Sequence, residues 1–357
     1  MSQKVDSGVA SREKGASVFK RFENSTVLSI LIGFVVIIVA VQLVSGIIRG
    51  SFGLPTFISP NNLLNIFMQV SVAGLLAVGM TMVMVSGGID LSVGMLVSLT
   101  TIFMAKCVTD WKFSLLAALI LGFLVCVFLE TLLGFIISRT KVESFIITLG
   151  GMIMFQGIAL LLCGSREVRL TKGEFDFLKI NLIQGAKYNG LNLVITPYVI
   201  IFIFAAAIIW SLMKFTKYGR RIYAVGSNPN AAFLSGVNVK NMRMSAYTIN
   251  GVLVFLASCA LNSRLGVAII SGGQGLEIDA IAAAVIGGIA MSGGKGNAWG
   301  AFIGALLLGA IGNAMSMLKL PGEWQYIVKG VVIILSVVAG AISAIFSAKL
   351  GKKGQKA

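Results

Sequence analysis

Histidine is absent from this 357-residue chain, and charged residues make up only 12% of it. Without an imidazole, the catalytic and metal-site patterns that depend on histidine are excluded. The 13 acidic residues form no carboxylate pair in a recognisable catalytic motif. We therefore expect no enzymatic activity, no resident metal and no cofactor. A soluble domain needs about a quarter charged residues to cover its surface, so the scarcity of charge predicts a chain surrounded mostly by lipid.

Cysteine and proline are scarce as well. The cysteines have no paired spacing, which argues against a disulfide framework or a zinc site and predicts small buried apolar side chains. The five prolines fall in predicted loops or at a helix edge, where no helix hydrogen bond is lost. The four cysteines are Cys107, Cys126, Cys163 and Cys259.

Apolar residues, by contrast, account for 57% of the chain, and its mean hydropathy is +0.94. A bilayer core needs about 20 apolar residues per helix. By this length the sequence predicts an all-α polytopic membrane protein with about ten transmembrane helices. Its expected parts are a tail at 1–25, a transmembrane domain at 26–347 and a tail at 348–357. The expected spans are 26–47, 63–86, 91–109, 114–137, 145–163, 194–213, 244–264, 277–292, 298–318 and 324–347.

The formal charge of +16 follows the loops between these spans. With a cytoplasmic N-terminus, 18 of the 29 basic residues fall in segments predicted to be cytoplasmic, and five more lie in one long outer loop, 164–193. A basic excess in short loops marks the cytoplasmic side, whereas long loops translocate largely regardless of charge. The first apolar run lacks a small-residue cleavage site and predicts an uncleaved helix. We expect both termini in the cytoplasm, and basic residues that serve topology and do not bind nucleic acid.

The stretch "VSGGIDLSVG" at 85–94 interrupts a long apolar region. Gly87 and Gly88 let the chain leave one helix and turn into the next. Asp90 or Ser92 can then accept hydrogen bonds from the unpaired N–H groups that open the following helix, where the helix dipole favours negative charge. A charge in mid-membrane costs about 2.5–3.5 kcal/mol. Asp90 is therefore predicted to cap a broken helix, and the alternative is that it lines or gates a pathway.

A related stretch, "VIGGIAMSGG" at 285–294, matches the first at six of ten positions. Such a match indicates a weak internal repeat, although coincidence in glycine-rich sequence is the alternative.

Further polar residues lie near or within the predicted spans. Gln274, Glu277 and Asp279 are placed at a predicted outer mouth. For the two acidic residues a solvated helix start is the simpler interpretation, and pathway lining is the alternative. Polar groups inside spans must face the bundle interior, one another or water. The other polar residues near or within predicted spans are Gln69, Glu130, Gln156, Asn250 and Lys329.

The longest predicted cytoplasmic loop between spans, 214–244, contains a full set of helix signals. Asn228 is an N-cap residue, Pro229 suits the first helical position and Gly236 suits a stop. Helices this short are marginal in water, so one with exposed Phe and Leu needs a surface to pack against. That surface belongs either to a partner protein or to the chain's own bundle and the lipid. The helix body reads Ala231, Ala232, Phe233 and Leu234, followed by Ser235.

Taken together, five stretches resemble the permease subunits of ribose-type sugar ABC importers. That group lies within a superfamily that includes galactose, arabinose, autoinducer and branched-chain amino acid permeases. The resemblance covers about residues 61–337. The stretches are "GMTMVMVSGGIDLSVG" (79–94), "FIITLGGMIMFQGIALLL" (145–162), "YGRRIYAVGSNPNAAFLSGVNV" (218–239), "LEIDAIAAAVIGGIAMSGGKGNAWGAFIGALLLG" (276–309) and "YIVKGVVIILSVV" (326–338).

The resemblance implies a subunit of a complex in the bacterial inner membrane. Two permeases, as a pair of copies or of related chains, form the pathway, two cytoplasmic ATPase subunits drive it, and an extracytoplasmic binding protein delivers a monosaccharide of the ribose or galactose type. Transport then proceeds by alternating access, without bond chemistry in the permease. In such importers the short loop helix docks into the ATPase, which assigns this role to Asn228, Pro229, Ala231, Ala232, Phe233, Leu234, Ser235 and Gly236.

The chain also departs from these relatives. Where they often have Asn-Gly, an arginine and a proline, it has Leu133-Gly134, Gln156 and Glu143, and it adds Glu130. A nucleoside or amino acid permease of the same superfamily is therefore an alternative. From another class, the alternative is a secondary transporter driven by an ion gradient. Its coupling carboxylate would be Asp90, Glu130, Glu277 or Asp279.

Overall fold

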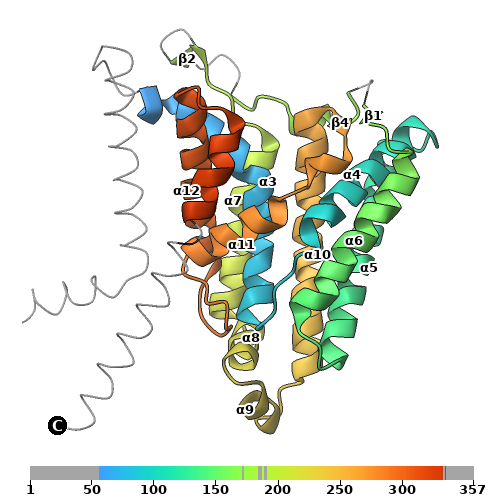
Figure 1. Ribbon diagram of the computed structural model, residues 1–357, viewed down its shortest axis with the longest axis vertical. Helices are drawn as coiled ribbons and strands as arrows, with labels where there is room; N and C mark the ends of the chain where they lie inside the picture. The colour runs from blue at the N-terminus through green and yellow to red at the C-terminus, as the bar shows by residue number, and fades with distance from the viewer. Residues whose placement is uncertain (1–55, 171–172, 184–186, 189–190, 333, 335–357) are drawn as a thin grey trace, which may run out of the picture.

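The computed structural model describes residues 56–332 and 334, apart from 171–172, 184–186 and 189–190 (Figure 1). The expected span 26–47 and both predicted tails lie outside the described residues. Of the expected span 324–347, only residues 324–332 and 334 are described. The elements in chain order are η1 (Thr56–Ile58), α3 (Pro60–Val85), α4 (Val93–Thr109), α5 (Leu115–Arg139), α6 (Ser144–Cys163), β1 (Val168–Arg169), η2 (Asp176–Leu178), β2 (Lys187–Tyr188), β3 (Leu191–Asn192), α7 (Pro197–Phe215), α8 (Lys217–Ser227), α9 (Pro229–Leu234), α10 (Val239–Leu265), β4 (Val267–Ala268), η3 (Ile270–Gly272), α11 (Leu276–Ile286) and α12 (Ala298–Met317).

Within the described residues, six helices are long and apolar enough to cross a membrane: α3, α5, α6, α7, α10 and α12. Each falls on an expected span, so the prediction of a polytopic helical membrane protein is confirmed. The strands form two antiparallel pairs of two residues each, β1 with β4 and β2 with β3. Strand β1 ties the segment after α6 to the end of α10.

The count of about ten transmembrane helices is not confirmed. The expected span 277–292 falls on α11, which has only 11 residues. At 1.5 Å per residue, such a helix covers about 16 Å, roughly half of a bilayer core. The expected span 91–109 falls on α4, which is apolar but has 17 residues. At α11 the apolar sequence continues beyond the last helical residue, into the glycine-rich loop. At α4 the apolar sequence begins before the first helical residue.

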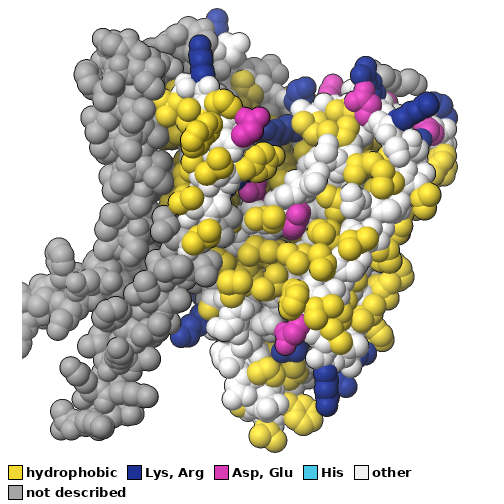
Figure 2. All heavy atoms as spheres, in the orientation of Figure 1, with side chains coloured by type: hydrophobic (Ala, Val, Ile, Leu, Met, Phe, Trp, Pro, Cys, Tyr) yellow, Lys and Arg dark blue, Asp and Glu magenta, His cyan; other side chains and the backbone are white. Residues whose placement is uncertain are grey.

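The long helices differ in how they face their surroundings. Helix α3 lies in the centre, packed against α7, α10, α11 and α12, and 78% of its most apolar segment is buried. In α6 that share is 22%, although its hydropathy is as high. Figure 2 shows hydrophobic side chains spread over the outer surface of α5 and α6. An apolar surface of this extent suits contact with lipid chains.

Small residues allow the central helices to approach closely. A Cβ atom on Gly300 of α12 would lie 2.1 Å from the carbonyl oxygen of Gly287, which ends α11. Only glycine therefore permits this contact between the two helices. The small residues between 280 and 312 therefore let α11 and α12 pack closely, as small residues do in membrane helix bundles.

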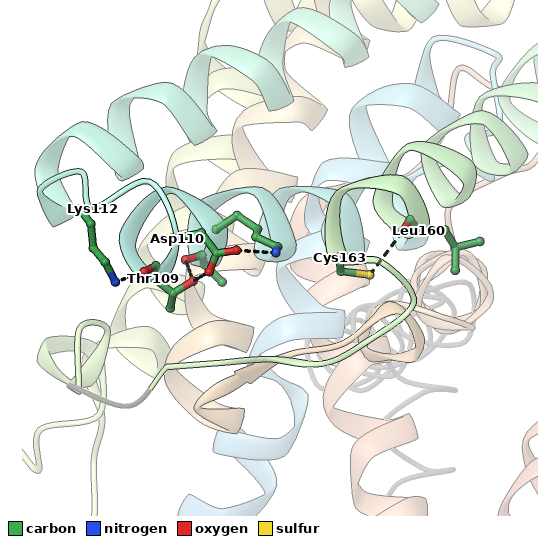
Figure 3. Close-up of polar contacts among 7 residues, drawn as sticks. Thr109, Asp110, Lys112, Leu160 and Cys163 are labelled. Atoms are coloured by element: carbon green, nitrogen blue, oxygen red, sulfur yellow. Dashed lines mark hydrogen bonds and ion pairs between the residues drawn. The ribbon is translucent and has the colours of Figure 1, made fainter.

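Polar contacts close the turn between α4 and α5 (Figure 3). The Lys106 ammonium lies 2.5 Å from Asp110 Oδ2, and Thr109 Oγ1 donates to Asp110 Oδ1 at 2.9 Å. The Lys112 ammonium donates in turn to the carbonyl oxygen of Thr109. The hydrogen bonds from Lys106 and Thr109 lower the pKa of Asp110. This carboxylate therefore stays charged at neutral pH and marks a wetted end of the bundle.

The four cysteines are free and buried, as the sequence predicts. Cys163, at the end of α6, donates a weak hydrogen bond to the carbonyl oxygen of Leu160 at 3.8 Å (Figure 3). Within the described part of the chain, no three Cys, Asp or Glu side chains converge as a metal site would require.

Candidate functional site

Helix α9 has the capping predicted from its sequence. Asn228 Oδ1 accepts a hydrogen bond of 3.0 Å from the N–H of Ala231, and Pro229 is the first helical residue. At the other end, Gly236 has a φ of +80°, and the N–H of Val237 donates to the carbonyl of Ala232 at 3.0 Å. A left-handed glycine with this bond is a Schellman stop. Local chemistry alone therefore defines both ends of the helix.

The apolar side of α9 is only partly covered. Ala232 is buried against the bundle, whereas Phe233 is 69% exposed and Leu234 is 85% exposed. Figure 1 places α9 at the far tip of the molecule, and Figure 2 shows hydrophobic side chains at that tip. The described part of the bundle does not cover these two side chains. Packing of α9 on its own bundle therefore explains the burial of Ala232 but leaves Phe233 and Leu234 without a surface.

Helix α8 connects α9 to the bundle through a cluster of glycines. A Cβ on Gly226 would lie 1.8 Å from the carbonyl oxygen of Val85 and 2.6 Å from the nitrogen of Gly294. A Cβ on Gly293 would lie 2.9 Å from Gly87 Cα. We call Gly87, Gly226, Gly293 and Gly294 the glycine junction. It brings the end of α3, the end of α8 and the loop before α12 into backbone contact.

Two side-chain hydrogen bonds support α8 beside this junction. Tyr223 Oη donates to the carbonyl oxygen of Gly296 at 2.6 Å, and the hydroxyl groups of Tyr218 and Ser245 lie 2.9 Å apart. Burial raises the pKa of both tyrosines. They therefore remain neutral hydrogen-bonding groups across the physiological pH range. Helices α8 and α9 are thus fastened to α10 and to the loop before α12.

The two related glycine stretches end their helices with the same turn. After α3, Gly87 has a φ of +88°, and the N–H of Gly88 donates to the carbonyl of Val83. After α11, Gly288 has a φ of +84°, and the N–H of Ile289 donates to the carbonyl of Ala284. The equivalent positions are shifted by one residue from the sequence match. Both helices end in a Schellman stop, but α9 ends in one as well, so the internal repeat stays a prediction.

The predicted capping role is wrong for Ser92, whereas Asp90 accepts one backbone N–H at the start of α4. Ser92 is the N-cap residue of α4 but makes no side-chain cap, and Asp90 Oδ1 instead accepts from the N–H and Oγ of Ser92 at 2.8 and 2.6 Å. Asp90 Oδ2 accepts from Asn250 Nδ2 on α10 at 3.1 Å. The Asp90 carboxylate therefore connects the start of α4 to α10. Gly87, Gly88 and Asp90 do lie in the break between α3 and α4.

Gln274, Glu277 and Asp279 do not converge. Gln274 is exposed, whereas Glu277 is buried: its Oε1 accepts from the N–H of Gly275 at 3.2 Å and its side chain lies against Gly94 of α4. A solvated helix start is therefore wrong for Glu277, because α4 packs over it. Asp279 forms an ion pair of 2.9 Å with Lys329.

Asp279 and Lys329 line a cavity of about 200 Å³ between α3, α11, α12 and the segment 322–332. Its wall combines apolar side chains with several hydrogen-bond donors and acceptors. Such a lining suits a small polar solute. Sequence reasoning named Gln69 and Lys329 as polar groups in spans but did not bring them to one cavity. The other polar residues that line this cavity are Arg264, Ser316 and Gln325.

The glycine junction was also missed from the sequence. Gly226 and Gly293 lie in separate predicted loops, and each is one of 42 glycines. Only the repeated pattern of 85–94 and 285–294 hinted that two such turns meet.

Comparison with known proteins shows the family. The family model described as "Branched-chain amino acid transport system / permease component" matches residues 62–337. Ribose import permease protein RbsC of Bacillus subtilis is 36% identical over 284 residues, covering 80% of this chain and 86% of the relative. RbsC of Haemophilus influenzae is 36% identical over 307 residues, covering 86% and 91%.

Xylose transport system permease protein XylH of Escherichia coli is 33% identical over 337 residues, covering 79% of this chain and 85% of the relative. No solved structure matches the chain significantly. The family match spans the described helices from the first turn of α3 onward, including the break after α3, the glycine junction and α9. The chain therefore belongs to the permease-component family of branched-chain amino acid-type transport systems, and it is a membrane-embedded transport protein, not an enzyme.

Proposed function

We propose that this chain is the permease subunit of an ABC importer that carries a monosaccharide across the bacterial inner membrane by alternating access. ATP hydrolysis then belongs to separate cytoplasmic ATPase subunits, and an extracytoplasmic binding protein delivers the solute. The named relatives are ribose and xylose permeases, which supports a sugar as the solute. A second permease copy or a related chain completes the pathway.

The observation that carries this proposal is the uncovered apolar surface of α9. Phe233 and Leu234 project from a short helix whose two ends are capped. Burying two such side chains against a partner contributes about 1.5–3 kcal/mol each. A groove on the ATPase is the proposed partner surface, and Asn228, Pro229 and Gly236 hold α9 in the shape that enters it.

Movement of α9 passes to the membrane helices through the glycine junction. Gly226 touches both Val85 at the end of α3 and Gly294 in the loop before α12. Backbone contacts of this kind have no flexible side chain to absorb a displacement. A shift of α8 and α9 by the ATPase therefore moves α3 and α12 together, and both line the cavity that contains Asp279 and Lys329.

The α9 end is proposed to be cytoplasmic, with both tails on that side. The basic residues Arg220, Arg221, Lys240 and Lys295 are in or near α8, the start of α10 and the glycine junction. Such an excess is the usual mark of the cytoplasmic side. The segment 1–25, the transmembrane domain 26–347 and the segment 348–357 are the proposed parts of the chain.

The solute is proposed to cross along polar groups that hold it weakly. Tight binding in mid-pathway slows release, so affinity is expected to reside mainly in the binding protein. The Asp279–Lys329 pair, Gln69 and Gln325 are the proposed contacts for sugar hydroxyl groups.

Replacing Phe233 and Leu234 together by Asp tests the docking role. We expect the ATPase to be lost from the purified complex and ATP-driven uptake in proteoliposomes to fall at least tenfold, while membrane insertion is unchanged. Asn241→Asp is the matched control, because it adds a negative charge at the exposed start of α10 without removing an apolar contact. Full ATPase association and uptake in the double variant would contradict the proposal. Uptake by this chain alone under an ion gradient would instead support a secondary transporter.

A further inference from the structure

Two carboxyl groups and one amide meet in the middle of the bundle. Asp90 follows the turn that ends α3, Glu130 lies on α5 and Asn250 lies on α10, and all three are 0% exposed. Asn250 Nδ2 donates to Asp90 Oδ2 at 3.1 Å and to Glu130 Oε1 at 3.0 Å. A side-chain amide has two N–H donors, so both are used.

The hydrogen bonds of this cluster lack one donor. The carboxyl groups of Asp90 and Glu130 lie side by side, because both accept a hydrogen bond from the same nitrogen, Asn250 Nδ2. Glu130 Oε2 is buried and has no donor among the described residues. Ionised carboxylates only accept hydrogen bonds and repel each other, so two of them around one amide nitrogen favour the uptake of one proton.

The two carboxyl groups have unequal surroundings. Asp90 accepts three hydrogen bonds, two from Ser92 and one from Asn250, whereas Glu130 accepts one from Asn250. Hydrogen bonds to a carboxylate stabilise its charged form. The negative charge therefore belongs on Asp90 and the proton on Glu130.

No cation compensates a second negative charge here. None of the ion pairs in the described part of the chain involves Asp90 or Glu130. The titratable groups that face Glu130 are Asp90, Cys126 on its own helix and Tyr247 on α10, and none of them is a base. An unpaired charge in a low-dielectric interior is costly, so taking up one proton is the cheaper state.

A separate polar cavity lies one helical turn away from Asn250 along α10. Tyr247, one turn before Asn250 on α10, lines a cavity of about 160 Å³ together with Arg243, Ser86 and Ser144. The Tyr247 hydroxyl and Arg243 Nε are buried without partners among the described residues.

We propose that Asp90 and Glu130 form a binding site for a single proton, which Glu130 carries and donates to Asp90. With Asn250, this proton joins α5 and α10 to the break between α3 and α4. It is a resident part of the fold and is not carried with the solute. The proposal does not depend on the solute or on the ATPase.

Infrared spectroscopy of the full-length chain in lipid nanodiscs tests the site directly. We expect the wild-type minus Glu130→Gln difference spectrum at neutral pH to show the carbonyl stretch of a protonated carboxylic acid. Glu143→Gln removes an exposed carboxylate at the start of α6 and is the control, for which only carboxylate bands should be lost. A difference spectrum for Glu130→Gln with carboxylate bands alone would overturn the proposal. If Glu130→Gln does not fold, wild type minus Asp90→Asn replaces it. Loss of a carboxylate band then supports an ionised Asp90, and loss of a protonated-acid band overturns the assignment.

Thermal melting gives an independent test. A glutamine is neutral and can both donate and accept, so Glu130→Gln should melt close to wild type, whereas Glu130→Ala should melt at lower temperature. Equal losses in both variants would count against a protonated Glu130. The melts are repeated with sodium and with choline as the only cation. Stabilisation by sodium that Glu130→Gln abolishes would replace the proton with a bound sodium ion.

Discussion

The backbone N–H of Gly294 donates a hydrogen bond of 2.9 Å to the carbonyl oxygen of Val85. This bond joins the last residue of α3 to the loop that precedes α12. Gly226 of α8 packs against both partners of this bond. The segment that leads to α9 therefore touches the bundle at the same place. Helix α8, the end of α3 and the loop before α12 therefore meet at one backbone contact.

Gly226→Ala should damage this contact. The added Cβ would lie 1.8 Å from the Val85 carbonyl oxygen, and the neighbouring atoms are backbone that cannot rotate away. Overpacking of this kind costs about 1–3 kcal/mol. We expect a lower melting temperature and a larger loss of ATP-driven uptake than of ATPase association.

Gly157→Ala on α6 is the control for this variant, because a Cβ there meets no atom within 4 Å. It should melt at or slightly above the wild-type temperature, since alanine favours a helix. If Gly226→Ala behaves like Gly157→Ala, the backbone contact does not transmit movement.

Asn228→Ala should loosen the start of α9. It removes the side-chain oxygen that accepts the N–H of Ala231, a loss of about 0.5–2 kcal/mol for the helix. Because α9 is short, we expect weaker ATPase association, measured by co-purification at graded salt, with little change in the melting of the bundle. Asn228→Asp should restore the association.

Asn241→Ala is the matched comparison, since its side chain is exposed on the first turn of α10. Its association with the ATPase should equal that of wild type. Equal association of Asn228→Ala would show that the cap does not matter for docking.

The Asp279–Lys329 pair should behave as a coupled unit. Both side chains are about a quarter exposed and lie 2.9 Å apart. Asp279→Asn and Lys329→Gln should each lower the melting temperature, and the double variant should lose less than the sum of the two. Interaction energies of about 0.5–3 kcal/mol are usual for residues in contact. Glu323→Gln changes the charge of an exposed residue on the same segment and should have no effect. Additive losses would show that the two side chains are not coupled.

For α9, sequence reasoning succeeded because the signals are local. An asparagine cap, a proline at the first position and a stop glycine act within a few residues of one another, so the tertiary structure changes little. The six long helices can be predicted from the sequence equally well, since about 20 consecutive apolar residues suffice to predict each.

For Glu277 the same reasoning failed, and for Asp90 it found the bond to the helix start but missed the bond to α10. Both were assigned to helix starts, and both are buried by another helix: Asp90 by α10 through Asn250, and Glu277 by α4 at Gly94. A local pattern identifies a polar group near a helix end but not the helix that packs over it. For α11, hydropathy predicted a span although the helix ends after 11 residues, because the glycine turn at Gly288 stops it within an apolar run.

The sequence by itself determined which segments enter the lipid and where helices begin and turn, because hydrophobicity and capping act over one to a few turns of chain. Only the tertiary structure decided that Asn250 meets both Asp90 and Glu130, and that Gly226 meets Val85 and Gly294. Those contacts depend on the rotation and crossing of helices far apart in the chain, to which no local pattern is sensitive.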